Sequence, residues 1–177
     1  MAMEITIRRA AGTDAPAIGE IYDEGVASGI ATFASGPHGP DERRAWLAAR
    51  PEGAPVFIAE DQSGLVLAWS ALAPYSHREW YSGVAEYTVY VRREHRTGGL
   101  GTKMLSHLIR TAPEYGYWKL VGMILPENSA GLRLAEREGF RLVGTHRAHG
   151  RIEGRWRDVT LVERHLDAAA PDEVATR

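Results

Sequence analysis

The segment that constrains the fold most runs from residue 84 to residue 112. It begins with "VAEYTVYVRR", whose β-branched and aromatic residues predict a central β-strand. Three glycines within four residues follow, Gly98, Gly99 and Gly101, and apolar residues then recur at helical spacing over residues 100–112. A strand that passes through a glycine-rich turn into an amphipathic helix predicts a protein that mixes sheet and helix.

The remaining patterns give the order of elements around this segment. Strand-like runs are "MEITIRRA", "PVFIAE", "LVLAWSALA", "WKLVGMIL", "FRLVGTHRA" and "GRWRDVTLVERHL", and helix-like runs are "TDAPAIGEIYDEGVAS", "DERRAWLAAR" and "NSAGLRLAERE". The order is therefore strand, two helices, three strands, helix, strand, helix and two strands. We expect an α/β (α+β) fold with a mixed, largely antiparallel central sheet flanked by helices.

Length and composition predict one domain without a membrane or nucleic-acid partner. The 177 residues are 44 % hydrophobic, which suits a single core, and we expect the domain to span residues 1–167 and residues 168–177 to form a disordered tail. The chain has no apolar run of about 18 residues. Its formal charge of −2 differs from the basic surface of nucleic-acid-binding proteins. The absence of cysteine excludes thiolate metal sites, and we expect a cytoplasmic protein.

The glycine-rich turn has the chemistry of an anion site without the spacing of the common nucleotide loops. The P-loop pattern is absent, and Met104 stands where the dinucleotide motif has its third glycine. What remains is Arg96-x-x-Gly99-x-Gly101 at a helix start, where unpaired backbone N–H groups and the helix dipole attract a pyrophosphate. The structural alternative is a tight turn that binds nothing.

Several segments together resemble one family. "RTGGLG" after "EYTVYV" is similar to the acyl-CoA pyrophosphate loop of the GNAT N-acetyltransferases, and "IRRAAGTDAPAIGEIY" and "LPENSAGLRLAEREGF" resemble two further segments of that family. Within it, "LAPYSHREWYSGVAEYTVYV" and "GTHRAHGRIEGRWRDV" look most like the phosphinothricin and methionine sulfoximine acetyltransferases. The resemblance implies a GNAT-like fold, acetyl-CoA as the donor, a small amino-acid-like amine as the acceptor, and no metal.

The resemblance also implies a set of cofactor-binding residues. The central strand would lend its backbone to the pantetheine arm, the glycine turn would bind the pyrophosphate, and two residues of the later helix segment would contact the rest of the cofactor. The implied residues are Val89, Tyr90, Val91, Arg96, Thr97, Gly98, Gly99, Leu100, Gly101, Thr102, Asn128 and Arg137.

Glu86 is the candidate catalytic base. An amine acceptor must lose a proton before it attacks a thioester, and a carboxylate buried in an apolar strand has the raised pKa suited to taking that proton. Glu86 shares one strand face with Thr88 and Tyr90, and it matches the position of the catalytic glutamate in the resembled subfamily. The structural alternative is a glutamate paired with Arg78 or Arg92.

Arg78 and Tyr81 are the candidate acceptor-binding residues. Arg78 matches a basic residue that the subfamily uses near the acidic end of its substrate, and a guanidinium suits a carboxylate or phosphinate. The chain departs from the pattern at Ser76 and Gly83, where some relatives have a second cation and an aromatic residue. The structural alternative for Arg78 is a solvated loop arginine.

Other residues leave alternatives open. Ala135 stands where many relatives place a Tyr or His that protonates the leaving thiolate, so the alternative to an enzyme is a binding module that senses acyl-CoA without turnover. Another amine, such as a polyamine, an aminoglycoside or a protein N-terminus, is a further alternative. His146 and His149 are three apart on a predicted strand, which should point them to opposite faces and away from a shared metal. The resemblance suggests a homodimer, to which Trp156 could contribute.

Overall fold

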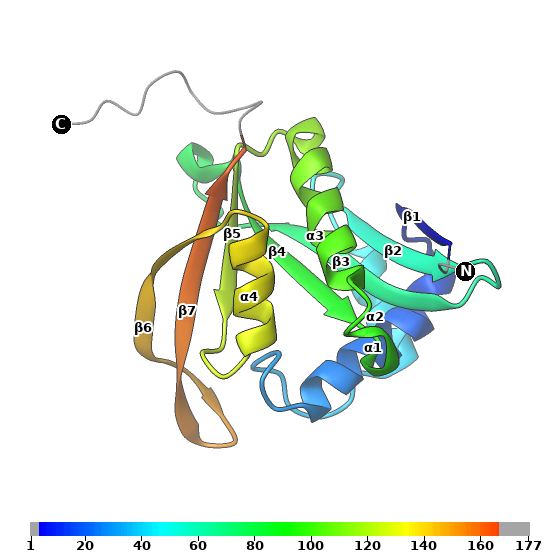
Figure 1. The fold of residues 1–177 in the computed structure, drawn as a ribbon, viewed down its shortest axis with the longest axis horizontal. Helices are drawn as coiled ribbons and strands as arrows, with labels where there is room; N and C mark the ends of the chain where they lie inside the picture. Colours follow the sequence, from blue (N-terminus) through cyan, green and yellow to red (C-terminus); the bar gives the residue numbers. More distant parts are fainter. Residues whose placement is uncertain (1–3, 167–177) are drawn as a thin grey trace.

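A seven-stranded sheet in the order β1-β2-β3-β4-β5-β7-β6 forms the centre of the computed structural model, which describes residues 4–166 (Figure 1). The predicted tail at 168–177 lies outside the described residues. All neighbouring strands are antiparallel except β4 and β5. The strands are β1 Ile5–Arg9, β2 Val56–Asp61, β3 Val66–Pro74, β4 Val84–Val91, β5 Lys119–Ile124, β6 Arg141–Ile152 and β7 Arg155–His165. The α-helices are α1 Ala15–Ala27, α2 Pro40–Ala48, α3 Leu100–Thr111 and α4 Ser129–Arg137.

Helices cover both faces of the sheet, and each face has its own apolar cluster. In Figure 1, α3 and α4 lie in front of the sheet and α1 and α2 behind it. Met104, Leu105 and Leu108 of α3 pack into the larger cluster, whereas Ile18 and Ile21 of α1 pack into the smaller one. The predicted order of strands and helices is confirmed, and the sheet is the mixed, largely antiparallel one that the patterns indicated.

The two parallel strands separate partway along their length. Glu86 of β4 and Val121 of β5 are the last residues paired between them, although both strands continue further. In Figure 1 the two ribbons diverge behind α4. The ring of Tyr87 lies against Gly122 at this point, where a Cβ would come within 2.6 Å of the ring. One edge of β4 beyond Glu86 therefore has no strand partner among residues 4–166.

A local irregularity in β6 contradicts one expectation from the sequence. The pairing of β6 with β7 loses its regular register between His146 and Gly150, where Ala148 adopts a φ of 49°. The rings of His146 and His149 consequently stack with their centroids 4.5 Å apart, so the expectation that they point to opposite faces is wrong. Within residues 4–166, no three histidine or acidic side chains are grouped so that they could hold a metal ion.

None of the helices in the described part of the chain combines the length and the apolar character needed to cross a bilayer.

Alanine substitutions at two buried glycines of α1 should change the stability of the protein in opposite directions. A Cβ at Gly25 would lie 2.6 Å from Cε1 of Tyr90, whereas one at Gly19 would meet its nearest atom at 3.6 Å. We expect Gly25→Ala to lower the free energy of unfolding by about 1–3 kcal/mol through overpacking. Gly19→Ala should raise it by about 0.5–1 kcal/mol, because alanine is the better helix former. Urea denaturation measures both, and equal effects of the two substitutions would contradict the packing of Tyr90 on α1.

Candidate active site

The glycine-rich turn connects β4 to α3 and presents free backbone donors. Gly99 is the N-cap of α3 with a φ of 76°, a left-handed conformation that glycine adopts without strain. The first backbone bond at this end runs from the Lys103 N–H to the Gly99 carbonyl, at 3.1 Å. The N–H groups of residues 100–102 therefore have no backbone acceptor within residues 4–166. They carry the positive end of the helix dipole and suit an anion.

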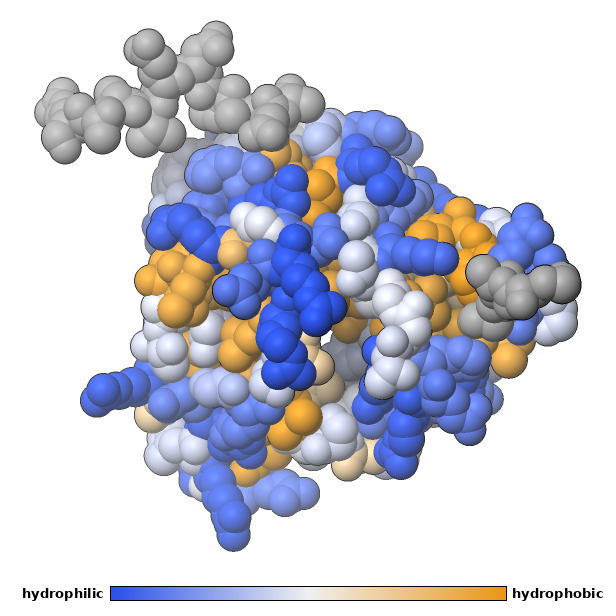
Figure 2. All heavy atoms as spheres, viewed as in Figure 1, coloured by the Kyte–Doolittle hydropathy of each residue, from blue (hydrophilic) through white to orange (hydrophobic). Residues whose placement is uncertain are grey.

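A cavity of about 530 Å³ opens beside this turn, and we call it the turn cavity. Figure 2 shows the surface hollowed between α4 and the start of α3. Three arginines lie in its wall, Arg96, Arg133 and Arg137, which makes it a basic pocket. Of the cofactor residues implied by the sequence, those that line it are Val89, Tyr90, Val91, Arg96, Thr97, Gly99, Gly101, Thr102, Asn128 and Arg137. Gly98 and Leu100 are outside the lining, and Leu100 packs into the core.

Asn128 lies where β5 leads into α4. Its side chain accepts a hydrogen bond of 2.9 Å from the Gly131 N–H and so caps the helix. The same residue lines the turn cavity, so its position serves both the helix and the pocket.

A second cavity of about 680 Å³, the sheet cavity, lies on the α1 and α2 side of β4. Glu86, Thr88 and Tyr90 all line it, as their shared strand face predicted. The two cavities have six residues in common: Ala31, Val89, Tyr90, Asn128, Gly131 and Leu134. The glycine turn and Glu86 therefore face adjoining cavities that share a wall near the point where β4 and β5 separate.

Glu86 is a half-buried carboxyl group without a partner. Within residues 4–166 its side chain has neither a hydrogen bond nor an ion pair, and burial raises its pKa above the usual value of a glutamate. Arg92, one of the partners considered, instead approaches Glu20 at 3.2 Å and Glu24 at 3.8 Å. Arg78, the other, places its guanidinium 5.9 Å from the ring of Trp80. The ion-pair alternative for Glu86 is therefore wrong.

Arg78 and Tyr81 lie apart from these cavities. Both belong to the exposed loop that precedes β4, and neither lines the turn cavity or the sheet cavity. The Tyr81 ring packs edge-on against Tyr75, with ring centroids 6.3 Å apart. Their role in binding the acceptor stays a prediction.

The sheet cavity contains residues that sequence reasoning did not select. Tyr22 of α1, Arg43 and Trp46 of α2, and Trp69 of β3 all line it. Arg43 is only 6 % exposed, although arginine is rarely buried without a partner. The one signal in the sequence for Arg43 as a site residue was its spacing from Trp46. The two are three residues apart, which puts both on one face of a predicted helix that is otherwise rich in charge.

Ala135 does not face the candidate site. It is fully buried in the core beneath α4 and lines neither cavity. A larger side chain at this position would enter the core rather than the space beside Glu86.

Comparisons with known proteins agree with this geometry. The family model described as "Acetyltransferase (GNAT) domain" matches residues 7–161. The chain is 34 % identical to the L-methionine sulfoximine/L-methionine sulfone acetyltransferase of Pseudomonas paraeruginosa, over 93 % of this chain and 96 % of the relative. It is 32 % identical to the phosphinothricin N-acetyltransferase of Streptomyces coelicolor, over 92 % and 97 % of the two chains. An acetyltransferase from Salmonella typhimurium, solved with its cofactor acetyl-CoA, superposes with a TM-score of 0.86 at 32 % identity and covers 97 % of this chain and 99 % of its own.

Proposed function

The chain belongs to the GNAT acetyltransferase family, and we propose that it transfers the acetyl group of acetyl-CoA directly to the amine of a small amino-acid-like acceptor, with Glu86 as the general base. The relatives named for methionine sulfoximine, methionine sulfone and phosphinothricin support this class of acceptor. The family match at residues 7–161 also supports our proposal of a single domain over residues 1–167.

The observation that carries the proposal is the wall that the turn cavity and the sheet cavity share. The turn cavity contains unpaired N–H groups and three arginines, which suit phosphate groups. The sheet cavity contains the unpaired carboxyl group of Glu86. The shared wall includes Val89 and Tyr90, from the part of β4 without a strand partner on one edge. A cofactor bound along this edge would have its phosphates at the turn and its reactive end near Glu86.

The residues of the turn fit the cofactor that the family uses. Gly101 leaves the surface of α3 free of a side chain, and the N–H groups of residues 100–102 are available to the pyrophosphate. Arg96 reaches the same cavity while its Nε donates to the Val91 carbonyl at 3.1 Å. Asn128 and Arg137 lie on the opposite wall, in α4 and its cap. When bound there, acetyl-CoA supplies an activated acetyl group.

Glu86 would act on the acceptor rather than on the cofactor. An α-amino group is largely an ammonium ion at neutral pH, and Glu86 would take one of its protons directly or through a water. The free amine forms the new C–N bond to the acetyl carbon, and the C–S bond breaks. The nitrogen then gives its surplus proton to water, and the thiolate takes up one from water. Burial raises the pKa of Glu86 and makes it a stronger base than an exposed glutamate.

Direct transfer is also consistent with the nucleophiles that the chain has. It contains no cysteine. Ser70 is fully buried, and within residues 4–166 its hydroxyl has no hydrogen-bond partner that could activate it.

The proposed function is tested by following free thiol release from acetyl-CoA with a panel of amines. The panel should contain phosphinothricin, methionine sulfoximine and methionine sulfone, with a polyamine and an aminoglycoside as the alternative acceptors. Turnover with the amino-acid-like compounds is expected. Turnover only with the polyamine or the aminoglycoside would show that the acceptor is not amino-acid-like. Tight binding of acetyl-CoA without any turnover would favour a sensor.

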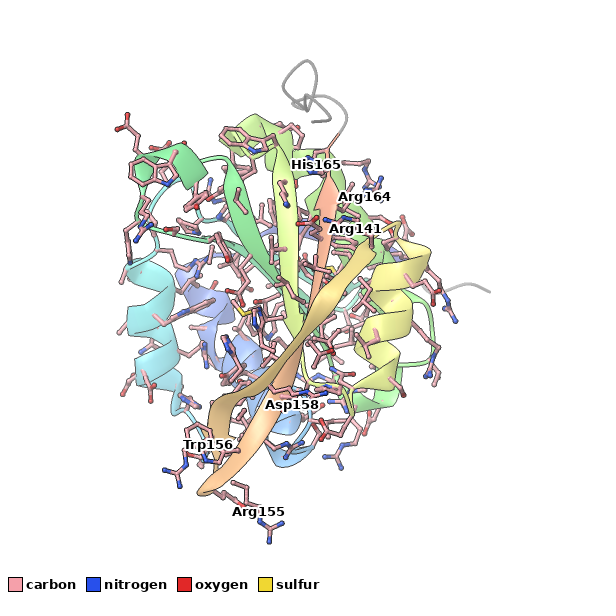
Figure 3. All side chains as sticks on the ribbon, turned by 90° about the vertical axis from the view of Figure 1, so that its left-hand side faces the viewer. Arg141, Arg155, Trp156, Asp158, Arg164 and His165 are labelled. Atoms are coloured by element: carbon pink, nitrogen blue, oxygen red, sulfur yellow. The ribbon has the colours of Figure 1, made fainter. Side chains whose placement is uncertain are left out.

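We also propose that the protein is a homodimer that pairs through the β6–β7 hairpin. Leu142 and Val143 of β6 are 64 % and 43 % exposed, and Trp156 of β7 is 62 % exposed. Figure 3 shows Trp156 near the free end of this hairpin. Light scattering should give twice the chain mass of 19.5 kDa for the wild type and the single-chain mass for Trp156→Glu. A wild type that has the single-chain mass would refute the dimer.

A further inference from the structure

Arg43 is a buried cation whose hydrogen-bonding capacity is not used within the described chain. It lies on α2 and is 6 % exposed, and its side chain has no ion pair or hydrogen bond within residues 4–166. Its Nε is buried without an acceptor. The guanidinium lies 4.3 Å from the ring centroid of Tyr22 and 4.9 Å from that of Trp46, so aromatic faces hold it in place. These faces supply no acceptor in the guanidinium plane, where a carboxylate or phosphinate would bind.

The other arginines of the sheet cavity are already engaged. Arg50 donates from Nε to the Ala54 carbonyl at 2.8 Å and from a terminal nitrogen to the Leu72 carbonyl. Arg151 donates to the Gly154 carbonyl at 2.9 Å. Glu86 is the one carboxylate among the described residues that line this cavity, which also contains the three arginines. The cavity therefore has an excess of positive charge and disfavours a polycationic acceptor.

A second unused donor accompanies Arg43. The indole of Trp69 is 2 % exposed, and its N–H is buried without an acceptor within residues 4–166. The ring is fixed by stacking on Tyr90, with centroids 4.9 Å apart and planes at 18°, and by an edge-on contact with Trp46. Two rigid donors without acceptors, on residues that line one cavity, are unfavourable unless a ligand or a water satisfies them.

The sheet register separates these donors from the proposed base. Trp69 pairs with Tyr90, whereas Glu86 pairs with Ala73, four residues further along β4 and β3. Four residues of extended strand correspond to about 13 Å between Cα atoms. Glu86, Arg43 and Trp69 line the same cavity, so an acceptor whose amine lies at Glu86 would extend its side chain along that cavity toward the two donors.

From this arrangement we infer that Arg43, assisted by the Trp69 N–H, binds an anionic group at the side-chain end of the acceptor. The inference rests on the proposed function and narrows its acceptor to amino acids with an acidic side chain, such as one that ends in a phosphinate. It also assigns to Arg43 the recognition that the sequence had suggested for Arg78. Because the guanidinium can form two parallel hydrogen bonds to such a group, it discriminates against an uncharged end of similar size.

The test compares two acceptors of similar length that differ in charge. Phosphinothricin ends in an anionic phosphinate, and methionine sulfone has an uncharged sulfone. The wild type should prefer phosphinothricin. Arg43→Gln should lower kcat/KM for phosphinothricin by about 10- to 100-fold, and that for methionine sulfone by less than about threefold. Arg44→Gln is the matched control, because Arg44 is the next residue of the same helix, is exposed, and pairs with Asp41 at 2.7 Å. It should change neither value.

Two further measurements keep the inference testable if Arg43→Gln folds poorly. Trp69→Phe removes the N–H but keeps an aromatic ring, and should reduce kcat/KM selectively for phosphinothricin by a few-fold. Calorimetric titration of phosphinothricin into the CoA-bound protein reports binding without turnover. Affinity that depends on Arg43 without any acetyl transfer would uphold the inference and refute the proposed function.

Three results would overturn the inference while leaving the proposed function standing. One is an equal loss of kcat/KM for both acceptors in Arg43→Gln, which indicates a purely structural role. Another is no loss for either acceptor. The third is a phosphinothricin-selective loss in Arg78→Gln that Arg43→Gln does not reproduce.

Discussion

Glu86→Gln is expected to lower kcat for amine acetylation by about 10²- to 10⁴-fold, because an amide cannot take the acceptor proton. The substitution keeps the size of the side chain, and Glu86 does not line the turn cavity. Acetyl-CoA affinity, measured by calorimetry, should therefore stay at the wild-type value. Glu86→Asp is the matched variant, since it keeps the carboxylate but withdraws it by one methylene, and it should retain more activity than the glutamine variant. Wild-type turnover in Glu86→Gln would remove Glu86 from the mechanism.

The pH dependence of kcat/KM is a second, independent test of Glu86 as the general base. Burial raises the pKa of Glu86, and the proton-accepting form exists only above that pKa. The wild-type kcat/KM should thus fall as the pH is lowered through a value above 4.5, the ordinary pKa of the group. A pH profile of thiol release, with the acetyl-CoA concentration saturating, measures this limb. If Glu86→Gln retains the same limb, another group is responsible for it.

Gly101→Glu is expected to weaken acetyl-CoA binding by more than about 10²-fold, because the new carboxylate would enter an anion site at a helix start. The structure leaves room for a small side chain there. A Cβ at Gly101 would lie 3.4 Å from Leu134 and 3.8 Å from Val91. Gly101→Ala should therefore fold and bind nearly normally, and it serves as the steric control. The melting temperature of both variants should stay near that of the wild type, and normal affinity in Gly101→Glu would exclude the turn from the cofactor site.

The order of strands and helices could be predicted from the sequence because the apolar residues of each element recur with a clear period. The patterns that predicted a strand over residues 84–93 and a helix over residues 100–112 depend on local spacing alone, and the structure has these elements at residues 84–91 and 100–111. Where β4 parts from β5, the ring of Tyr87 lies against Gly122, a contact between distant residues that no local pattern records. The stacking of His146 on His149 similarly required a positive φ at Ala148, an unusual conformation for alanine.

The candidate site was predictable where the chain carries a compact motif. The glycine turn followed from residues close together in the sequence, and the family followed from several segments in their order along the chain. Glu86 followed from its place in an apolar strand and from its match to the family, and its role as the base stays a prediction. Arg43 and Trp69 were not foreseen, because α2 and β3 meet at the sheet cavity only in the folded chain. In isolation, Arg43 belongs to a charged helix and Trp69 to an apolar strand.

A second basic cavity is the alternative binding site for the phosphate groups of acetyl-CoA. A cavity between α4 and the ends of β6 and β7 is lined by Arg137, Arg141, Arg164 and His165, three of which Figure 3 labels. Its cations are largely engaged, since Arg141 pairs with Glu163 and Arg164 donates to the Glu138 carbonyl. The turn cavity instead offers N–H groups without acceptors in the described chain, which favours it as the phosphate site.

A crystal structure of the protein with acetyl-CoA tests the central claim most directly. We expect the pyrophosphate on the N–H groups of residues 100–102, and the thioester beside β4, within reach of an amine held at Glu86. A pyrophosphate bound instead among Arg141, Arg164 and His165, with the thioester away from Glu86, would contradict it.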